Sequence, residues 1–202
     1  MLQYRKFIRF DRGIIVTLPE NVLEITHHFI EKAVREGDVV VDATMGNGHD
    51  TLFLSKIVKD SGKVYAFDIQ EQALNSTKKL LEKEGATGNT TLILSGHENM
   101  KEYVSEEVSA VMFNLGYLPG GDHSIGTVAD TTIKAIGSAM ELIKKNGVVT
   151  IGVYYGGDSG FDEKNKVMEF ISQIDFKKFT VLTIDYKNRP NCPPIAVIIE
   201  KL

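Results

Sequence analysis

A glycine-rich stretch near residue 45 carries the side chains whose types and spacing best suit ligand binding. Its polar and glycine residues are Asp42, Thr44, Gly46, Asn47, Gly48, His49, Asp50 and Thr51. Two closely spaced glycines allow the backbone to turn tightly and to approach a ligand. The helix expected next presents free N–H groups and a partial positive charge. The pattern therefore predicts a cofactor-binding turn between a strand and a helix.

The acidic residue ahead of this turn indicates which ligand it binds. Dinucleotide-binding proteins seat a pyrophosphate on a G-x-G-x-x-G/A turn, but here Thr51 occupies the third glycine position and Asp42 precedes the turn. A carboxylate disfavours a pyrophosphate and favours a cation, such as the sulfonium and ammonium groups of S-adenosylmethionine (SAM). We expect Asp42 to act on SAM directly or through the local field. The alternative is an ordinary glycine-rich turn in which Asp50 caps the helix.

Two further polar positions follow the next apolar runs of the sequence. Asp68, two residues before Gln70, ends one such run, and a carboxylate there can accept both hydroxyls of a ribose. Acidic residues are common at strand ends, so Asp68 indicates a ribose site only in combination with the glycine-rich turn before it. His97 and Glu98 follow the third run and could meet an adenine ring. They could equally start a helix, with Glu98 in its favourable first turn.

The segment after the fourth apolar run is where we place the chemistry. Enzymes that methylate exocyclic amines carry an Asn- or Asp-Pro-Pro-Tyr turn at this point, and Asn114-Leu-Gly-Tyr117 is a looser version without the prolines. Such a turn can orient a neutral amine for in-line attack on the SAM methyl group. Asparagine cannot take up a proton at neutral pH, so the proton would pass to water, or to Asp122 or His123. The alternative is that this glycine-rich segment only connects two elements.

The elements that must position these residues follow from the hydrophobic periodicity. Apolar, β-branched runs are typical of strands buried in a parallel sheet, and apolar residues at helical spacing predict amphipathic helices. Parallel strands are expected at 38–42, 63–68, 91–94, 109–113 and 147–153. Helices are expected at 20–36, 52–58, 74–81, 133–143 and 167–174.

The end of the chain breaks this alternation. Runs at 179–184 and 195–199 are separated by a loop too short for a helical crossover, so these two strands should be antiparallel. The sequence therefore predicts an α/β fold with a doubly wound, seven-stranded, mostly parallel sheet that contains one antiparallel strand. In such sheets ligands bind beyond the carboxyl ends of the strands, where the polar residues above are expected to meet.

Composition restricts the class of protein further. The chain has 202 residues, 43% hydrophobic and 25% charged, which suits a single domain over 1–202. Its apolar runs are far shorter than a membrane-spanning helix needs, and the N-terminus lacks the pattern of a signal peptide. Cys192 is the only cysteine, which excludes an internal disulfide. We expect a cytoplasmic protein that does not enter a membrane.

The charge distribution leaves one candidate surface for nucleic acid. A net charge of −4 argues against a basic coat that binds nucleic acid indiscriminately. Near the N-terminus, however, the four cations Arg5, Lys6, Arg9 and Arg12 lie among three aromatic residues. Such a mixture can contact phosphates and stack on unpaired bases. The alternative is an edge strand whose aromatic residues are buried.

Taken together, these motifs resemble the bacterial "putative rRNA methylase" family of class I SAM-dependent methyltransferases, over about residues 20–200. Members of that family include the enzyme that methylates the amino group of 5-aminomethyl-2-thiouridine at the tRNA wobble position. The resemblance implies a Rossmann-like fold, SAM contacts from the 46–50 turn, from Asp68 with Gln70 and from His97 with Glu98, and acceptor contacts from Asn114 and Tyr117. His49 departs from the family pattern, in which asparagine is expected.

The leading functional hypothesis is a SAM-dependent N-methyltransferase that acts on a tRNA wobble aminomethyl-uridine. One alternative keeps SAM and replaces the acceptor with rRNA or a small molecule. Another is a non-catalytic dinucleotide- or nucleotide-binding module that regulates a partner, against which Asp42 and Thr51 argue. The sequence leaves open whether the protein is a monomer or a homodimer.

Overall fold

Strands and helices alternate along residues 18–116 and 126–202, which the computed structural model describes. The strands are β1 (Val39–Asp42), β2 (Lys63–Asp68), β3 (Thr90–Leu94), β4 (Val108–Leu115), β5 (Ile143–Val153), β6 (Phe179–Ile184) and β7 (Ile195–Lys201). The helices are α1 (Val22–Ala33), α2 (His49–Val58), α3 (Glu71–Glu84), the 3-10 turn η1 (His97–Asn99), α4 (Met100–Tyr103), α5 (Ala129–Leu142) and α6 (Gly157–Ser172).

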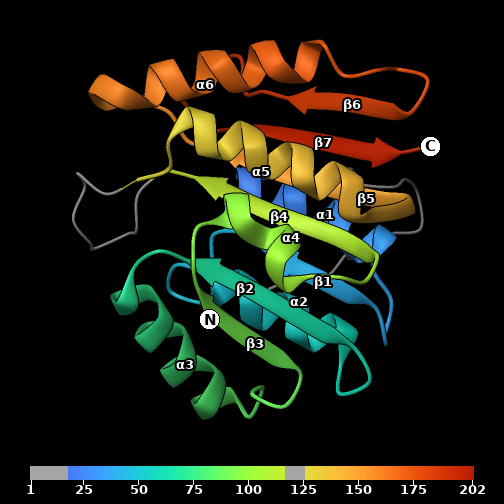
Figure 1. Cartoon of the computed structure of the whole chain (residues 1–202). Coiled ribbons are helices and arrows are strands. Elements are labelled where there is room, and N and C mark those ends of the chain that lie inside the picture. Colours follow the sequence, from blue (N-terminus) through green and yellow to red (C-terminus); the bar gives the residue numbers. More distant parts are fainter. Residues whose placement is uncertain (1–17, 117–125) are drawn as a thin grey trace, which may run out of the picture.

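The strands form one seven-stranded sheet in the order β3-β2-β1-β4-β5-β7-β6 (Figure 1). Neighbouring strands are parallel from β3 to β5, whereas β7 runs antiparallel to both β5 and β6. The predicted α/β class, with one antiparallel strand in a mostly parallel sheet, is confirmed. The strand order reverses between β1 and β4, so the carboxyl ends of these two strands flank the switch point at which such sheets bind ligands.

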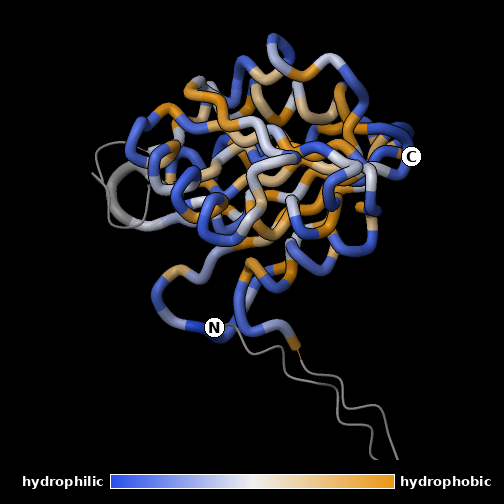
Figure 2. Tube along the Cα trace, turned by 90° about the horizontal axis from the view of Figure 1, so that it is seen from below, coloured by the Kyte–Doolittle hydropathy of each residue, from blue (hydrophilic) through white to orange (hydrophobic). Residues whose placement is uncertain are grey.

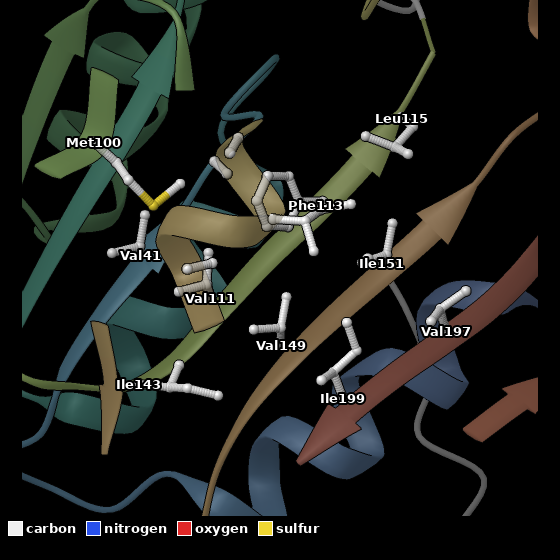
Figure 3. Packing of buried hydrophobic residues seen from close by; sticks show 14 of the residues in the cluster. Val41, Met100, Val111, Phe113, Leu115, Ile143, Val149, Ile151, Val197 and Ile199 are labelled. Atoms are coloured by element: carbon white, nitrogen blue, oxygen red, sulfur yellow. The ribbon is translucent and has the colours of Figure 1, made fainter. Parts of the chain in front are cut away.

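Two layers of helices cover the sheet and bury its apolar strands. Helices α1 and α2 pack on one face with Val40, Val64 and Met112, while α5 and α6 pack on the other, where Phe113 and Ile151 are buried (Figure 3). Central strands that are apolar on both faces need cover on both sides. Accordingly, the apolar segments run through the middle of the molecule and the polar ones along its outside (Figure 2). None of the described helices is long and apolar enough to cross a membrane.

Two helix boundaries differ from the sequence-based expectation. Ile143 has helical spacing, but α5 ends at Leu142 and Ile143 begins β5. The backbone then turns at Asn146, which has a positive φ of 60°, a conformation that asparagine tolerates better than most residues. Ile174 was also expected in a helix and lies beyond the end of α6 at Ser172. Both isoleucines keep apolar contacts with the core, which explains why periodicity alone misassigns them.

Candidate functional site

The turn after β1 has the shape that its two glycines predict. Gly46 and Gly48 have positive φ angles of 50° and 84°. A Cβ atom at Gly48 would lie 2.8 Å from the side chain of Thr77 on α3. The Thr77 hydroxyl donates a hydrogen bond of 3.0 Å to the Gly46 carbonyl. Helix α3 thus fixes the turn from outside, and only glycine fits at position 48.

Asp68, at the end of β2, joins this turn to the start of α3. Its Oδ2 accepts a hydrogen bond of 3.0 Å from the Gly46 N–H, and its Oδ1 accepts one of 2.9 Å from the Gln70 N–H. Each carboxylate oxygen has a second acceptor position. The half-buried Asp68 can therefore hold the turn and still accept both hydroxyls of a ribose.

Asp42 lies beneath the turn and not at its surface. Its side chain is wholly buried, and it accepts hydrogen bonds from the Thr51 hydroxyl at 2.6 Å and from the Thr44 N–H at 3.2 Å. Burial raises the pKa of Asp42 to about 7, and the charge of Asp50 adds to the increase, although the bond from Thr51 opposes it. The structure therefore gives Asp42 a role in holding the turn and does not expose it for direct contact with a ligand.

We expect this carboxyl group to make stability depend on pH between about 4 and about 7. The folded-state pKa lies above the ordinary value of 3.8. The stability that the neutral carboxyl contributes is therefore fully present below pH 3.8 and is lost as the pH rises through the folded-state pKa. Asp42→Asn does not ionise, so its free energy of unfolding should rise relative to wild type across this window. Urea unfolding of both proteins at about pH 5 and about pH 8 measures the change. A difference that is independent of pH would contradict the raised pKa.

Asn114, near the end of β4, is held from two sides and has one acceptor atom to spare. Its backbone N–H donates to the Thr44 hydroxyl at 2.7 Å, and its Nδ2 donates to Asp50 Oδ2 at 2.6 Å. A carboxylate only accepts, so this contact fixes the orientation of the amide. Asn114 Oδ1 is buried and has no hydrogen-bond partner among the described residues. A Cβ at Gly152 on β5 would approach this oxygen to 2.8 Å, so the absence of a side chain there leaves it room.

His27 and Tyr154 belong to the same cluster and were missed by sequence reasoning. His27 Nε2 lies 2.7 Å from Asp50 Oδ1, and its ring stacks on Phe53 at 3.8 Å between centroids. Tyr154 directly follows β5. Burial raises the pKa of its phenol, and the charge of Asp50 raises it further. His27 shows no distinctive pattern in the sequence, whereas Tyr154 could have been found by inspecting the residue after every parallel strand.

His97 connects the segment after β3 to the segment after β1. The imidazole is only 8% exposed, and its Nδ1 lies 3.1 Å from the Ala43 carbonyl. Burial lowers the pKa of His97, and a carbonyl can only accept, so the neutral ring donates from Nδ1. Its edge contacts the ring of Phe113. Glu98 lies beside it, with its carboxylate close to Gly96, so both predicted residues are on the same edge of the sheet as the turn.

Two hydrogen bonds join the chain on either side of residues 117–125, and two more join the later side to α6. The Gly116 N–H donates to the Thr127 hydroxyl, and the Thr127 N–H donates to the Gly116 carbonyl, both at 2.9 Å. The Thr127 hydroxyl donates in turn to Glu163 Oε2, and Thr132 donates to Oε1, both at 2.7 Å. We call this set the Gly116–Thr127 clasp. The buried Glu163 of α6 thus anchors the chain after the segment, and Thr127 links this anchor to Gly116 before it.

The remaining predicted residues divide into two groups. Asn47 is half-buried in the turn, and His49 is exposed at the first position of α2. The others lie outside the described residues. These are the predicted acceptor-site residues Tyr117, Asp122 and His123 and the N-terminal cations Arg5, Lys6, Arg9 and Arg12.

The fold and the residues at its carboxyl edge define a class I SAM-dependent methyltransferase. The chain belongs to the family described as "Putative rRNA methylase", whose model matches residues 64–200. A putative rRNA methylase from Clostridium thermocellum has the same fold, with a TM-score of 0.91 and 51% identity over 92% of this chain and 100% of that one. A putative methyltransferase from Streptococcus mutans, solved in complex with SAH, the demethylated cofactor, gives a TM-score of 0.85 and 42% identity over the same shares.

A relative with a named RNA substrate is also similar. The chloroplastic tRNA (mnm(5)s(2)U34)-methyltransferase of Arabidopsis thaliana is 38% identical over 190 residues, which cover 88% of this chain and 69% of that protein. The cofactor of this chain is SAM, as predicted. The described part of the site fits it, because the turn needs the shape of glycine at position 48 and Asp68 retains acceptor positions.

Proposed function

We propose that this protein methylates the amino group of 5-aminomethyl-2-thiouridine at the wobble position of tRNA. The observation that supports an amine as the methyl acceptor is Asn114 Oδ1. This buried oxygen can accept a hydrogen bond and has no partner among the described residues. Leaving such an atom unpaired costs roughly 1–3 kcal/mol, which an N–H donor from the substrate would offset. The name of the Arabidopsis thaliana relative supports the choice of nucleoside.

The chemistry follows from this contact. SAM supplies an electrophilic methyl group on a sulfonium. One N–H of the neutral amine donates to Asn114 Oδ1, which leaves the nitrogen lone pair free to face that methyl group. As the N–C bond forms and the S–C bond breaks, the nitrogen becomes cationic and must lose a proton. Asn114 cannot accept it, so we assign the proton to water or to Asp122 or His123.

Each predicted cofactor residue has a place in this proposal. Asp68, with Gln70 beside it, accepts the ribose hydroxyls, and His97 with Glu98 borders the adenine. The 46–50 turn lies along the methionine part of SAM. Asp50 bonds to Asn114, so it couples the cofactor turn to the acceptor side chain. His27 and Phe53 hold Asp50 in position from α1 and α2.

The experiment is methylation of tRNA that carries the aminomethyl group, followed by mass analysis of its nucleosides. We expect purified protein and SAM to convert 5-aminomethyl-2-thiouridine to its N-methyl form, and a deletion strain to accumulate the unmethylated nucleoside in cytoplasmic tRNA. The matched control is the same tRNA without the aminomethyl group, which should not react. Methylation of rRNA alone, with this tRNA unchanged, would refute the proposal.

A further inference from the structure

Two cations at the active-site edge lie over aromatic rings and form no ion pair among the described residues. Lys164 Nζ of α6 lies 4.9 Å from the ring centroid of Tyr155 and 5.9 Å from that of Phe161. The guanidinium of Arg189 lies 3.8 Å from the ring centroid of Tyr186. Cations over ring faces are held in place by the ring quadrupole and keep their positive charge available to an anion.

The two cations, Lys164 and Arg189, and the rings beneath them lie at the edge of the sheet that carries the methyl-transfer site. Helix α6 begins four residues after β5 ends at Val153. Ile195 pairs with Val153, and Ile184 pairs with Ala196, so the β6–β7 connection (185–194) emerges at that same end of β5. In Figure 1 the arrowheads of β4 and β6 and the start of α6 share one side of the molecule, and β5 runs parallel to β4.

Charged groups of the β6–β7 connection act on the ring of Tyr155. Burial raises the pKa of Tyr155, and Cys192 and Asp185 of the β6–β7 connection raise it further, whereas Lys187 lowers it. The connection therefore lies beside the ring of Tyr155. Tyr154, the preceding residue, is 39% exposed and senses the charge of Asp50. Tyr154, Tyr155 and Phe161, which we call the aromatic strip, thus lie between the acceptor site and the connection.

The start of the described chain is attached to this connection as well. The Tyr186 hydroxyl donates to the Pro19 carbonyl at 2.9 Å, and Arg189 donates to the Glu20 carbonyl. The described chain therefore begins beside the β6–β7 connection.

We propose that this strip binds the single-stranded RNA that flanks the target nucleotide, an inference that rests on the proposed function. Tyr154, Tyr155 and Phe161 would stack on unpaired bases, and Lys164 and Arg189 would contact phosphates. The nearby cations Lys166 and Lys187 are already neutralised, because Lys166 forms an ion pair with Asp162 and Lys187 forms one with Asp185. Phosphate contacts are therefore assigned to the two cations that lie on rings.

The test measures KM for an anticodon stem-loop RNA that carries the aminomethyl group, at several salt concentrations. The double variant Lys164→Gln with Arg189→Gln should raise KM roughly tenfold and reduce the slope of log KM against log salt by about 1.4, since a single-strand phosphate contact contributes about 0.7. Phe161→Leu removes a stacking ring and should raise KM roughly tenfold with the wild-type salt slope. Lys166→Gln, on the same helix but paired with Asp162, is the matched control and should leave both quantities unchanged.

The outcomes separate this inference from the function on which it rests. If wild type methylates the stem-loop and the double variant keeps the wild-type KM and salt slope, the strip does not bind RNA and the inference is overturned. If wild type methylates no RNA but accepts a free amine, the proposed function itself fails. The SAM dissociation constant and the thermal midpoint of each variant show whether it is folded, and only folded variants enter the comparison.

Discussion

Asn114→Ala is expected to lower kcat by about 10²-fold while the SAM dissociation constant stays near its wild-type value. The variant removes Oδ1, the acceptor that would orient the amine, and Nδ2, which bonds to Asp50. The backbone contact to Thr44 remains, so the cofactor turn keeps its support from β4. Single-turnover kinetics with saturating RNA and calorimetric titration with SAM separate the two effects.

A second variant tests the same oxygen without deleting it. Gly152→Ala would bring a methyl group to within 2.8 Å of Asn114 Oδ1, so the amide must shift and kcat should also fall. Gly137→Ala is the matched control, because a Cβ there meets nothing within 4 Å and alanine favours the helix by up to about 1 kcal/mol. If Asn114→Ala retains activity but loses SAM, then Asn114 belongs to the cofactor site and the assigned role is wrong.

Asp68→Ala should weaken SAM binding at least tenfold in an enzyme that remains folded. Hydrogen bonds to a charged group contribute roughly 1.5–3 kcal/mol each, and the variant would lose two to the ribose. It would also release the Gly46 and Gln70 amides, so the turn itself would be less well ordered before SAM arrives. Calorimetric titration gives the dissociation constant, and the thermal midpoint reports whether the fold survives.

The control for this variant is Asp60→Ala, which removes a carboxylate from an exposed position in the turn before β2. Loss of one negative charge is common to both variants, so a general electrostatic effect on the cationic cofactor would appear in both. We expect the Asp60 variant to bind SAM as wild type does. Equal SAM affinity in all three proteins would remove Asp68 from the cofactor site.

The fold could be predicted because its elements are encoded locally. Both ends of β2 can be located from the sequence, since Val64–Phe67 is an unbroken apolar run flanked by Lys63 and Asp68. The antiparallel β7 followed from the length of one connection. Ile143 could not be placed in the same way, because its spacing suits a helix and the turn at Asn146 that moves it into β5 depends on tertiary packing.

The site was harder to predict because its central contacts join distant segments. Asp42 and Thr51 were each noted as unusual for a dinucleotide site, yet only the structure shows that they form one hydrogen-bonded pair. Asn114 and Asp50 were assigned to acceptor and cofactor, whereas the structure places them 2.6 Å apart. The position of His27 depends on how α1 packs against α2, and no local pattern encodes that arrangement.

The Gly116–Thr127 clasp affects how far the sequence of residues 117–125 can change. Reciprocal hydrogen bonds join the residues on either side of 117–125, and Thr127 is anchored to Glu163. The length and composition of this segment can therefore vary at little cost to the rest of the fold. Insertions, deletions or exchanges within this segment would leave the sheet and the SAM turn intact. The clasp therefore makes this segment a position at which the chain can be changed with little effect on the folding of the rest.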